Sequence, residues 1–473
     1  MYVAGIDSST QSTKVVLCRA EDGEIVEEAS AAHPDGTETD PRAWWDALNE
    51  AGRGMLGQAS AIGVAAQQHG MVTLDEDGRT VRPALLWNDV RSAPQARDLI
   101  DELGGPEVWA SRTGSVPTAS FTVTKLRWLA ENEPEAAART TSVLLPHDWL
   151  TWRLGGGAGP EGRGAGRAGR EPTTDRGDAS GTGYWSPGEG WLPEFARTAL
   201  GHDVRLPRVA APAETVGETS GGAILSPGTG DNMGAALGMG LRPGDVAVSI
   251  GTSGTAFVTV EKSTADPSGM VAGFADATGR FLPLVCTLNA ARILTTTAGL
   301  LGVDTGELSR LALRARPGAD GVTLLPYLDG ERTPNRPEAT GVLRGLTTAS
   351  ATRENLARAA VEAMLASLAD AVDYLRTQGA TVRRLLLIGG GARSGAVRRL
   401  APSVFGMPVD VPEPAEYVAI GAARQAAWAL SGDAEPPPWR PPAAQTYEDT
   451  PRPEIREQYA ALRDDTAAWH AQP

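Results

Sequence analysis

Residues 2–18, YVAGIDSSTQSTKVVLC, and residues 246–260, VAVSIGTSGTAFVTV, share one arrangement that decides the expected fold. In each stretch a short apolar run favours a β-strand, a turn of small hydroxyl-bearing residues follows, and a second apolar run predicts another strand. A unit that occurs near the start of each half predicts duplicated domains that face each other across a cleft. Backbone N–H groups in such turns suit phosphate oxygens, although apolar–turn–apolar segments also recur by coincidence.

Length, charge and cysteine content limit the classes of protein that fit. The 473 residues allow two or three domains, and the net charge of −15 disfavours binding to nucleic acid or to an anionic membrane, so small molecules are the expected partners. The two cysteines, Cys18 and Cys286, exclude a disulfide framework and a four-cysteine zinc site. The first residues do not resemble a signal peptide and no long apolar run occurs, so we expect a cytoplasmic protein.

Further along the chain, periodicity and composition predict two helices and one insertion. Residues 122–132 and 354–378 carry apolar side chains at helical spacing, which is typical of helices that pack against a core. Residues 155–170, GGGAGPEGRGAGRAGR, have almost no side chain able to bury apolar surface, so a flexible surface insertion is expected there.

Two aspartates stand where chemistry is expected. Asp231 follows a Pro-Gly-rich turn and begins a run of small residues that favours a helix, whose N-terminus would keep the carboxylate ionised. An ordinary N-cap is the commoner use of such an aspartate, so both interpretations stay open. Asp7 ends a strand before the Ser/Thr-rich turn, which suits Mg²⁺ near phosphates, with an Asx-turn as the alternative. The five histidines show no metal-ligand spacing.

Polar groups at three other predicted strand ends are candidates for binding. Gln67-Gln68-His69-Gly70 and Trp87-Asn88-Asp89 offer amide, imidazole and indole groups that hydrogen-bond a polyol, or they are satisfied strand-end clusters. Leu385 to Ile388 runs into a turn of three glycines, Gly389 to Gly391, and then a predicted helix. Such a turn lets the backbone approach a nucleotide, or it is a tight connection between strand and helix.

Two long patterns stand out in this sequence: SFTVTKLRWLAEN at residues 120–132, and GVLRGL at residues 341–346, continuing through NLARAAVE at residues 355–362. Both resemble the signatures of the FGGY carbohydrate kinases. Matching stretches include QQHG (67–70), LLWNDVR (85–91), GDN (230–232), SIGTSG (249–254), LPYLDGERTP (325–334) and IGGGARS (388–394). The resemblance implies an α/β fold of two duplicated actin-like, ribonuclease H-like domains with ATP in the cleft. Residues 1–240 would be the sugar-binding domain and residues 241–473 the nucleotide-binding domain.

The resemblance also implies an activity and a role for individual residues. The activity is ATP-dependent phosphorylation of D-xylulose to D-xylulose 5-phosphate, with Asp231 as general base. Asp7 would lie near the phosphates and hold Mg²⁺. The remaining implied contacts are Gln68, His69, Asp231 and Asn232 for the sugar, beside the candidates Trp87 and Asn88, and Ser9, Thr10, Gly251, Thr252, Ser253, Gly390, Gly391 and Ser394 for ATP.

Other functions on the same fold stay open. Kinases for ribulose, gluconate or fuculose fit the same motifs. A non-catalytic sugar sensor would need an added DNA-binding helix-turn-helix, which neither end of the sequence offers, and use as a filament or chaperone is disfavoured by the sugar-type segments. Many relatives have glycine where this chain has Ser9, and methionine often stands where it has Gln68. The sequence leaves a homodimer open.

Overall fold

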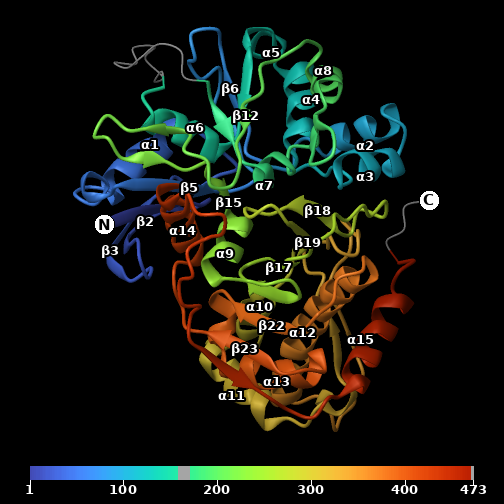
Figure 1. The fold of residues 1–473 in the computed structure, drawn as a ribbon. Coiled ribbons are helices and arrows are strands. Elements are labelled where there is room, and N and C mark those ends of the chain that lie inside the picture. The colour runs from blue at the N-terminus through green and yellow to red at the C-terminus, as the bar shows by residue number, and fades with distance from the viewer. Residues whose placement is uncertain (158–170, 470–473) are drawn as a thin grey trace. The chain divides into compact units, whose positions relative to one another are not determined.

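The computed structural model describes residues 1–157 and 171–469, which divide into two compact units (Figure 1). Unit 1 comprises Met1–Leu241, Glu261–Leu282 and Ala415–Pro441, and unit 2 comprises Arg242–Val260, Pro283–Pro414 and the chain from Pro442. Unit 1 therefore includes two segments beyond residue 240, where the sequence placed the boundary. Most of the insertion expected at residues 155–170 lies outside the described residues.

Unit 1 is built on a mixed sheet whose first two strands are the first of the repeated stretches. The sheet order is β13 (Gly217–Glu218), β14 (Ile224–Leu225), β5 (Ala61–Ala66), β1 (Tyr2–Ser8), β2 (Ser12–Arg19) and β3 (Ile25–Ala32), and β15 (Thr229–Gly230) also pairs with β5. The apolar alternation of β1 and β5 supplies core residues such as Ile6 and Val64, which pack with Trp44, Leu48 and Trp149. The predicted strand, turn and strand are confirmed.

Three parallel strands of this sheet end beside one another. In the register of β1 with β5, Asp7 lies opposite Ala65 and Ser8 opposite Ala66. In the register of β15 with β5, Gly230 also lies opposite Ala66. Because carboxyl ends of neighbouring parallel strands share one edge of a sheet, the segments after residues 8, 66 and 230 meet there.

A helix from near the end of the chain packs closely against unit 1. This helix, α14 (Tyr417–Ser431), contacts β1, β5 and α9 (Asp231–Met239) (Figure 1). A Cβ at Gly5 would come within 1.9 Å of Ala419 O, and a Cβ at Gly421 within 1.9 Å of Gly234 O. Only residues without a side chain fit at these two positions, so glycine sets the distance of α14 from the sheet and from α9.

Unit 1 also contains further helices and short strands. The helix predicted at residues 122–132 of unit 1 is confirmed and forms α4. The helices are α1 (Pro41–Ala51), α2 (Ala93–Glu102), α3 (Pro106–Thr113), α4 (Thr122–Asn132), α5 (Pro134–Arg139), α6 (Pro146–Leu154), α7 (Arg176–Ala179) and α8 (Pro193–Leu200). Shorter strands are β4 (Glu38–Thr39), β6 (Val72–Leu74), β7 (Ala84–Leu85), β8 (Ser142–Leu144), β9 (Thr173–Thr174), β10 (Trp185–Ser186), β11 (Gly190–Trp191), β12 (Arg208–Val209) and β18 (Ala272–Ala275).

Unit 2 repeats the arrangement of unit 1 with the second repeated stretch. Its sheet runs in the order β19 (Phe281–Thr287, in unit 2 from Pro283), β17 (Gly254–Val258), β16 (Asp245–Ile250), β22 (Arg384–Ile388), β23 (Val409–Pro412) and β24 (Ala444–Tyr447). Strands β16 and β17 are antiparallel, as β1 and β2 are, and β22 lies parallel to β16, as β5 lies parallel to β1. The duplication expected from the sequence is thus present in the strands.

Helices of unit 2 include the second one expected from periodicity. The helix predicted at residues 354–378 corresponds to α12 (Arg353–Thr377). It is buried along most of its length, as an apolar stripe at helical spacing predicts. The other elements are α10 (Ala291–Leu301), α11 (Thr305–Arg314), α13 (Gly395–Phe405), α15 (Pro453–Asp465), β20 (Thr323–Leu325) and β21 (Val342–Arg344). Within residues 1–157 and 171–469, no helix combines the length and the apolar character needed to cross a membrane.

Candidate active site

Asp231 is the first residue of α9 and lies at the shared strand edge of unit 1. The N-cap position belongs to Gly230, and the Asp231 carboxylate accepts hydrogen bonds from the backbone N–H and the side-chain Nδ2 of Asn232, each at 2.8 Å. Asn232 Nδ2 also donates to Gln68 Oε1 at 2.9 Å. The N-cap interpretation is therefore wrong, and the structure brings Gln68, Asp231 and Asn232 together as the sugar-site prediction requires.

The electrostatic surroundings of Asp231 favour its protonated form. Burial raises its pKa to about 7, and the negative charges of Asp7 and Asp178 add to the effect, while hydrogen bonds from Asn232 oppose it. A carboxylate with a raised pKa is a stronger proton acceptor than one exposed to water. Beside it, the buried Nε2 of Gln68 has no hydrogen-bond partner among the described residues and is a donor available to a substrate.

Asp7 and the turn after β1 form the second part of this site. Ser9 Oγ donates to Asp7 Oδ1 at 3.1 Å, and burial raises the pKa of Asp7 to about 6, opposed by the nearby charge of Lys14 and the bond from Ser9. Trp87 Nε1 donates to Thr10 Oγ1 at 2.8 Å. The loop that carries Trp87 is thereby tied to the turn predicted to bind phosphate.

His69 is held in one orientation at the end of β5. Its backbone has a φ of 66°, in the left-handed region, and its Nδ1 donates to Gly181 O at 2.6 Å. The ring stacks on Phe121 with centroids 4.7 Å apart and lies 5.6 Å from the ring of Phe274. A non-glycine residue in the left-handed region is uncommon and persists where surrounding contacts fix it, which is frequent at functional sites.

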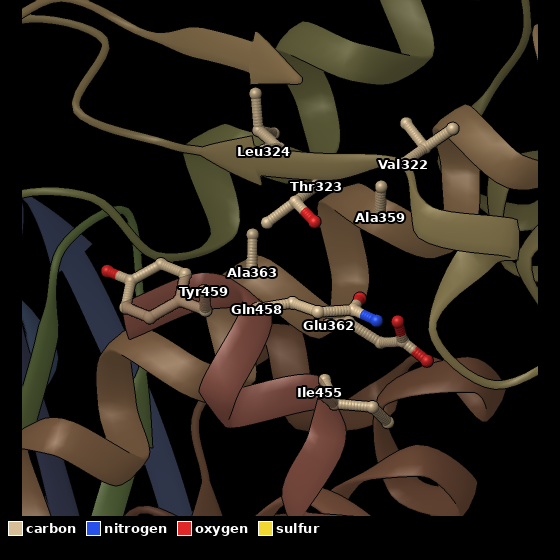
Figure 2. A pocket seen from close by; sticks show the side chains of 9 residues that line it. All are labelled: Val322, Thr323, Leu324, Ala359, Glu362, Ala363, Ile455, Gln458 and Tyr459. Carbon is tan, nitrogen blue, oxygen red and sulfur yellow. The ribbon is translucent and has the colours of Figure 1, made fainter. Parts of the chain in front are cut away.

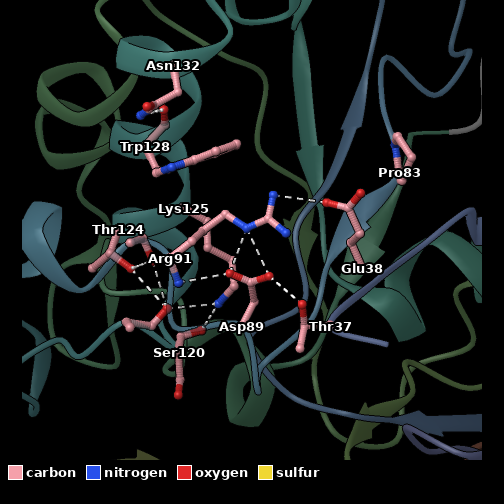
Figure 3. A network of polar contacts seen from close by, with 12 residues as sticks. Thr37, Glu38, Pro83, Asp89, Arg91, Ser120, Thr124, Lys125, Trp128 and Asn132 are labelled. Carbon is pink, nitrogen blue, oxygen red and sulfur yellow. Dashed lines mark hydrogen bonds and ion pairs between the residues drawn. The ribbon is translucent and has the colours of Figure 1, made fainter. Parts of the chain in front are cut away.

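A polar network anchors the loop that follows Trp87 and Asn88 (Figure 3). Arg91 Nε donates to both carboxylate oxygens of Asp89, at 2.9 and 3.0 Å, while its Nη1 lies 3.0 Å from Glu38 Oε2. The Arg91 guanidinium lies 4.9 Å from the centre of the Trp128 ring, on the first signature helix, α4. Burial acts to raise the pKa of Asp89, but hydrogen bonds and the charge of Arg91 outweigh it and lower that pKa. Asp89 is thus a charged anchor of the loop.

In unit 2 the two predicted nucleotide turns also follow neighbouring parallel strands. Ser249 of β16 lies opposite Ile388 of β22, so Gly251–Ser253 and Gly389–Gly391 begin at the same sheet edge. A Cβ at Gly391 would come within 2.3 Å of Ile250 Cγ2, so the glycine lets the two turns approach. Ser394 is the N-cap of α13, and its Oγ accepts from Val397 N at 3.5 Å.

The turn at Gly251 and Thr252 is held by residues that sequence reasoning did not single out. Glu331 is almost fully buried and accepts hydrogen bonds from Leu288 N at 2.6 Å and from Asn289 Nδ2 at 3.0 Å. The next two backbone N–H groups, of residues 290 and 291, donate to the carbonyls of Thr252 and Gly251 at 3.2 and 2.8 Å. Glu331 lies in the LPYLDGERTP stretch, which was the available signal.

A small cavity in unit 2 is separate from these turns (Figure 2). Its volume of about 10 Å³ is at the lower limit for a single water molecule. The cavity therefore has no room for a sugar or a nucleotide. Its lining residues are Val322, Thr323, Leu324, Ala359, Glu362, Ala363, Ile455, Gln458 and Tyr459.

Two more polar residues of unit 1, Lys14 and Gln67, lie in or beside strands of its sheet. Lys14 is half-buried and forms an ion pair with Glu416 at 2.5 Å, because a segment some 400 residues away folds back beside it. Gln67 is fully buried at the end of β5, and neither polar atom of its side chain has a hydrogen-bond partner among the described residues. The QQHG stretch pointed to Gln67, whereas nothing local pointed to Glu416.

Almost the whole chain is similar to carbohydrate kinases in sequence and in structure. Residues 2–238 match the N-terminal domain, and residues 246–430 the C-terminal domain, of the FGGY family of carbohydrate kinases. The chain is 50% identical over 450 residues to the xylulose kinase of Streptomyces coelicolor and 48% identical over 448 residues to that of Streptomyces rubiginosus. Each alignment covers 91% of this chain and 88% of the relative. A crystal structure of xylulose kinase from Bifidobacterium adolescentis is 46% identical, with a TM-score of 0.91 over 98% of this chain and 99% of the other.

The chain belongs to the FGGY family of carbohydrate kinases. The resemblance expected from its motifs is confirmed, and so is the α/β fold of two duplicated actin-like, ribonuclease H-like domains. The roles of single residues stay predictions, which the geometry above supports most directly for Gln68, Asp231 and Asn232.

Proposed function

We propose that this protein transfers the γ-phosphoryl group of ATP to the terminal hydroxyl of D-xylulose, giving D-xylulose 5-phosphate and ADP. The observation that carries the reaction is the half-buried Asp231 carboxylate beside Asn232 and Gln68 at the end of three parallel strands. The choice of sugar follows the two relatives named xylulose kinase, which are 48–50% identical over most of this chain.

Asp231 is the proton acceptor in this proposal. As the sugar oxygen attacks the γ-phosphorus, its proton passes to the Asp231 carboxylate, the bond to the ADP oxygen breaks, and ADP leaves. Phosphoryl transfer has a loose transition state, so positioning matters more than a strong base. Asn232 Nδ2 and the backbone N–H of residue 232 hold the carboxylate in one orientation. Gln68, His69 and Asn88 would hydrogen-bond the sugar hydroxyls, and Trp87, whose Nε1 donates to Thr10, would contact the sugar through its ring.

Nucleotide binding is assigned mainly to unit 2. Backbone N–H groups of the Gly251–Ser253 turn would bind phosphate oxygens, and Gly390, Gly391 and Ser394 would lie beside the adenosine. In unit 1, the turn that contains Ser9 and Thr10 would also bind phosphate oxygens of ATP. Because the chain carries a net charge of −15, neutral backbone donors suit ATP better here than a surrounding basic surface does.

The carboxylate of Asp7 is a chemically suitable ligand for Mg²⁺. A carboxylate oxygen is a hard ligand, and Mg²⁺ in kinases is commonly held by one or two carboxylates together with waters and substrate phosphates. No cluster of three or more His, Cys, Asp or Glu side chains with metal-binding geometry occurs in residues 1–157 and 171–469, so a cage of protein ligands is not present there. Bound Mg²⁺ would neutralise charge on the phosphate oxygens. Asp7 would keep its ionised form beside such a cation, against the burial that raises its pKa.

A panel of acceptors tests the proposed function. Purified protein is given ATP and Mg²⁺ with D-xylulose, ribulose, fuculose, gluconate, glycerol or xylitol, and ADP release is followed with a coupling enzyme. We expect D-xylulose to give the highest kcat/KM. A higher value with another sugar would make the protein a kinase for that sugar, and no turnover with any acceptor would favour the non-catalytic sensor.

The raised pKa of Asp231 gives an expected pH dependence. Because the base must be deprotonated and burial raises its pKa to about 7, kcat/KM for xylulose should fall about tenfold per pH unit below that value and level off above it. Initial rates measured in buffers between about pH 5 and pH 9 check this, with circular dichroism to confirm that the protein stays folded. A flat profile across the whole range would contradict the assignment of Asp231 as the titrating base.

A further inference from the structure

A buried histidine in unit 1 lies among three carboxylates. His147, in the first turn of α6, is fully buried, and its Nδ1 lies 2.9 Å from Asp178 Oδ2. Its Nε2 lies 3.1 Å from Asp148 Oδ1 and 3.7 Å from Asp175 Oδ1. The three aspartates are also buried. We call these four residues the His147 cluster, and the proposed reaction does not use any of them directly.

The charges of this cluster depend on one another. Burial acts to lower the pKa of His147, but the charge of Asp148 and the charge and hydrogen bond of Asp178 outweigh it and raise that pKa. The carboxylates beside the ring thus favour its imidazolium form. Removing one partner from a buried ion pair leaves uncompensated charge, which is strongly unfavourable. Burial raises the pKa of Asp148 to about 7 and that of Asp175 to about 6, and the charge of His147 opposes this, so without His147 these carboxyls would take up protons.

Contacts of the cluster lead to both turns of the proposed sugar site. Asp175 caps α7 by accepting from Gly177 N and Asp178 N, each at 2.9 Å, and it also accepts from Thr229 Oγ1 at 3.2 Å. Thr229 stands two residues before Asp231. His69 is linked to the cluster through Gly181, whose carbonyl accepts from His69 Nδ1 at 2.6 Å and whose N–H donates to Asp178 O at 2.9 Å.

The imidazole ring itself packs under the turn that leads to Asp231. A Cβ at Gly228, whose φ is 83°, would come within 2.4 Å of His147 Cδ2. The ring thus supports this glycine directly. Gly228 N and O are further paired with the side-chain amide of Gln425, each at 2.9 Å, which fixes the opposite side of the turn.

We propose that His147 is a positioning residue: its imidazolium, held by Asp178 and flanked by Asp148 and Asp175, fixes the two turns that carry His69 and Asp231. This inference rests on the proposed roles of His69 and Asp231. In its absence the aspartates lose their cationic partner and Asp178 loses its hydrogen bond, so the α7 turn shifts, and Thr229 and the His69 ring move with it. Small misplacements of a catalytic group lower rates by as much as about 10²-fold.

The first test is His147→Gln, which keeps a hydrogen-bonding amide but removes the positive charge. We expect kcat with xylulose to fall about tenfold and KM for xylulose to rise about tenfold, because both turns shift. KM for ATP should stay within about twofold, since the contacts of the cluster lead to the sugar turns. The double variant His147→Gln/Asp148→Asn removes one carboxylate together with the cation, and it should recover most of the lost kcat.

A second variant keeps the inference testable if His147→Gln does not fold. Thr229→Val removes the hydroxyl that links Asp175 to the turn before Asp231 and leaves every charge in place. It should lower kcat about fivefold without a change in KM for ATP. As a matched control, His202→Gln replaces a half-buried histidine whose Nε2 lies 2.9 Å from Thr140 O, and it should leave kcat and both KM values unchanged.

These outcomes separate the inference from the proposed function. If the parent protein turns over xylulose while His147→Gln and Thr229→Val both keep its kcat and sugar KM per folded molecule, the cluster is merely structural and the inference is wrong. Failure of the double variant to recover kcat would show that charge balance is not the means of positioning. A parent protein without activity on any sugar would instead overturn the proposed function.

Discussion

Replacing Asp231 with asparagine is expected to lower kcat with xylulose by about 10²–10⁴-fold, the usual loss when a general base is removed. Asparagine has nearly the same shape and keeps an oxygen that accepts from the N–H and Nδ2 of Asn232, so the local hydrogen bonds survive. The proton of the attacking hydroxyl then has no carboxylate to accept it. Initial rates from ADP release at saturating ATP and xylulose give the comparison, and KM for both substrates should change little.

Asp266→Asn is a matched control for this substitution. Asp266 is a buried aspartate of unit 1, where it accepts hydrogen bonds from Ser268 N at 3.0 Å and Val271 N at 2.9 Å. It has no role in the proposed reaction, so kcat per folded molecule should equal that of the parent. Equal rates for Asp231→Asn and the parent would show that Asp231 is not the base.

The second large effect is on stability. Gly421→Ala is expected to destabilise unit 1 by about 1–3 kcal/mol or more, because the added methyl would lie 1.9 Å from the carbonyl oxygen of Gly234. Backbone atoms cannot rotate away as a flexible side chain can, so α14 must move from α9. Urea denaturation followed by circular dichroism measures the change as a lower midpoint of the transition in which unit 1 unfolds.

Gly299→Ala makes the same chemical change but is expected to raise the stability of the protein rather than lower it. Gly299 lies in α10, and a Cβ there would meet no heavy atom within 4 Å. Alanine favours the helix over glycine, so this variant should gain up to about 1 kcal/mol. A loss of stability in both variants would show that close packing of α14 is not the cause of the effect at Gly421.

Much of the fold follows from local patterns in the sequence. The two strand–turn–strand stretches and the helices at residues 122–132 and 354–378 were found because apolar periodicity and turn residues act over short distances. The first stretch forms β1 and β2, and the second forms β16 and β17. No local pattern predicts that β5 lies beside β1 or that β22 lies beside β16. That strand order was implied only by the resemblance to the kinase family.

Local patterns predicted less of the candidate active site than of the fold. Gln68 and Asp231 lie more than 160 residues apart, and only the register of β1, β5 and β15 brings them together. No spacing in the sequence predicts the His147 cluster, because His147 and Asp148 come from one segment and Asp175 and Asp178 from another. Glu416, the partner of Lys14, lies just before α14, whose place beside β1 depends on glycines in both.

The position of α14 also bears on how the protein is made. Unit 1 needs Ala415–Pro441 to cover Val3 and Ala61 of its sheet with Ala419 and Ala423, yet the ribosome adds this segment after most of unit 2. Until then, newly made chains expose an apolar sheet face to water, a state prone to aggregation. We therefore expect unit 1 to complete its folding only near the end of translation, so that a chain stopped after residue 241 would need chaperone protection rather than behave as an independent domain.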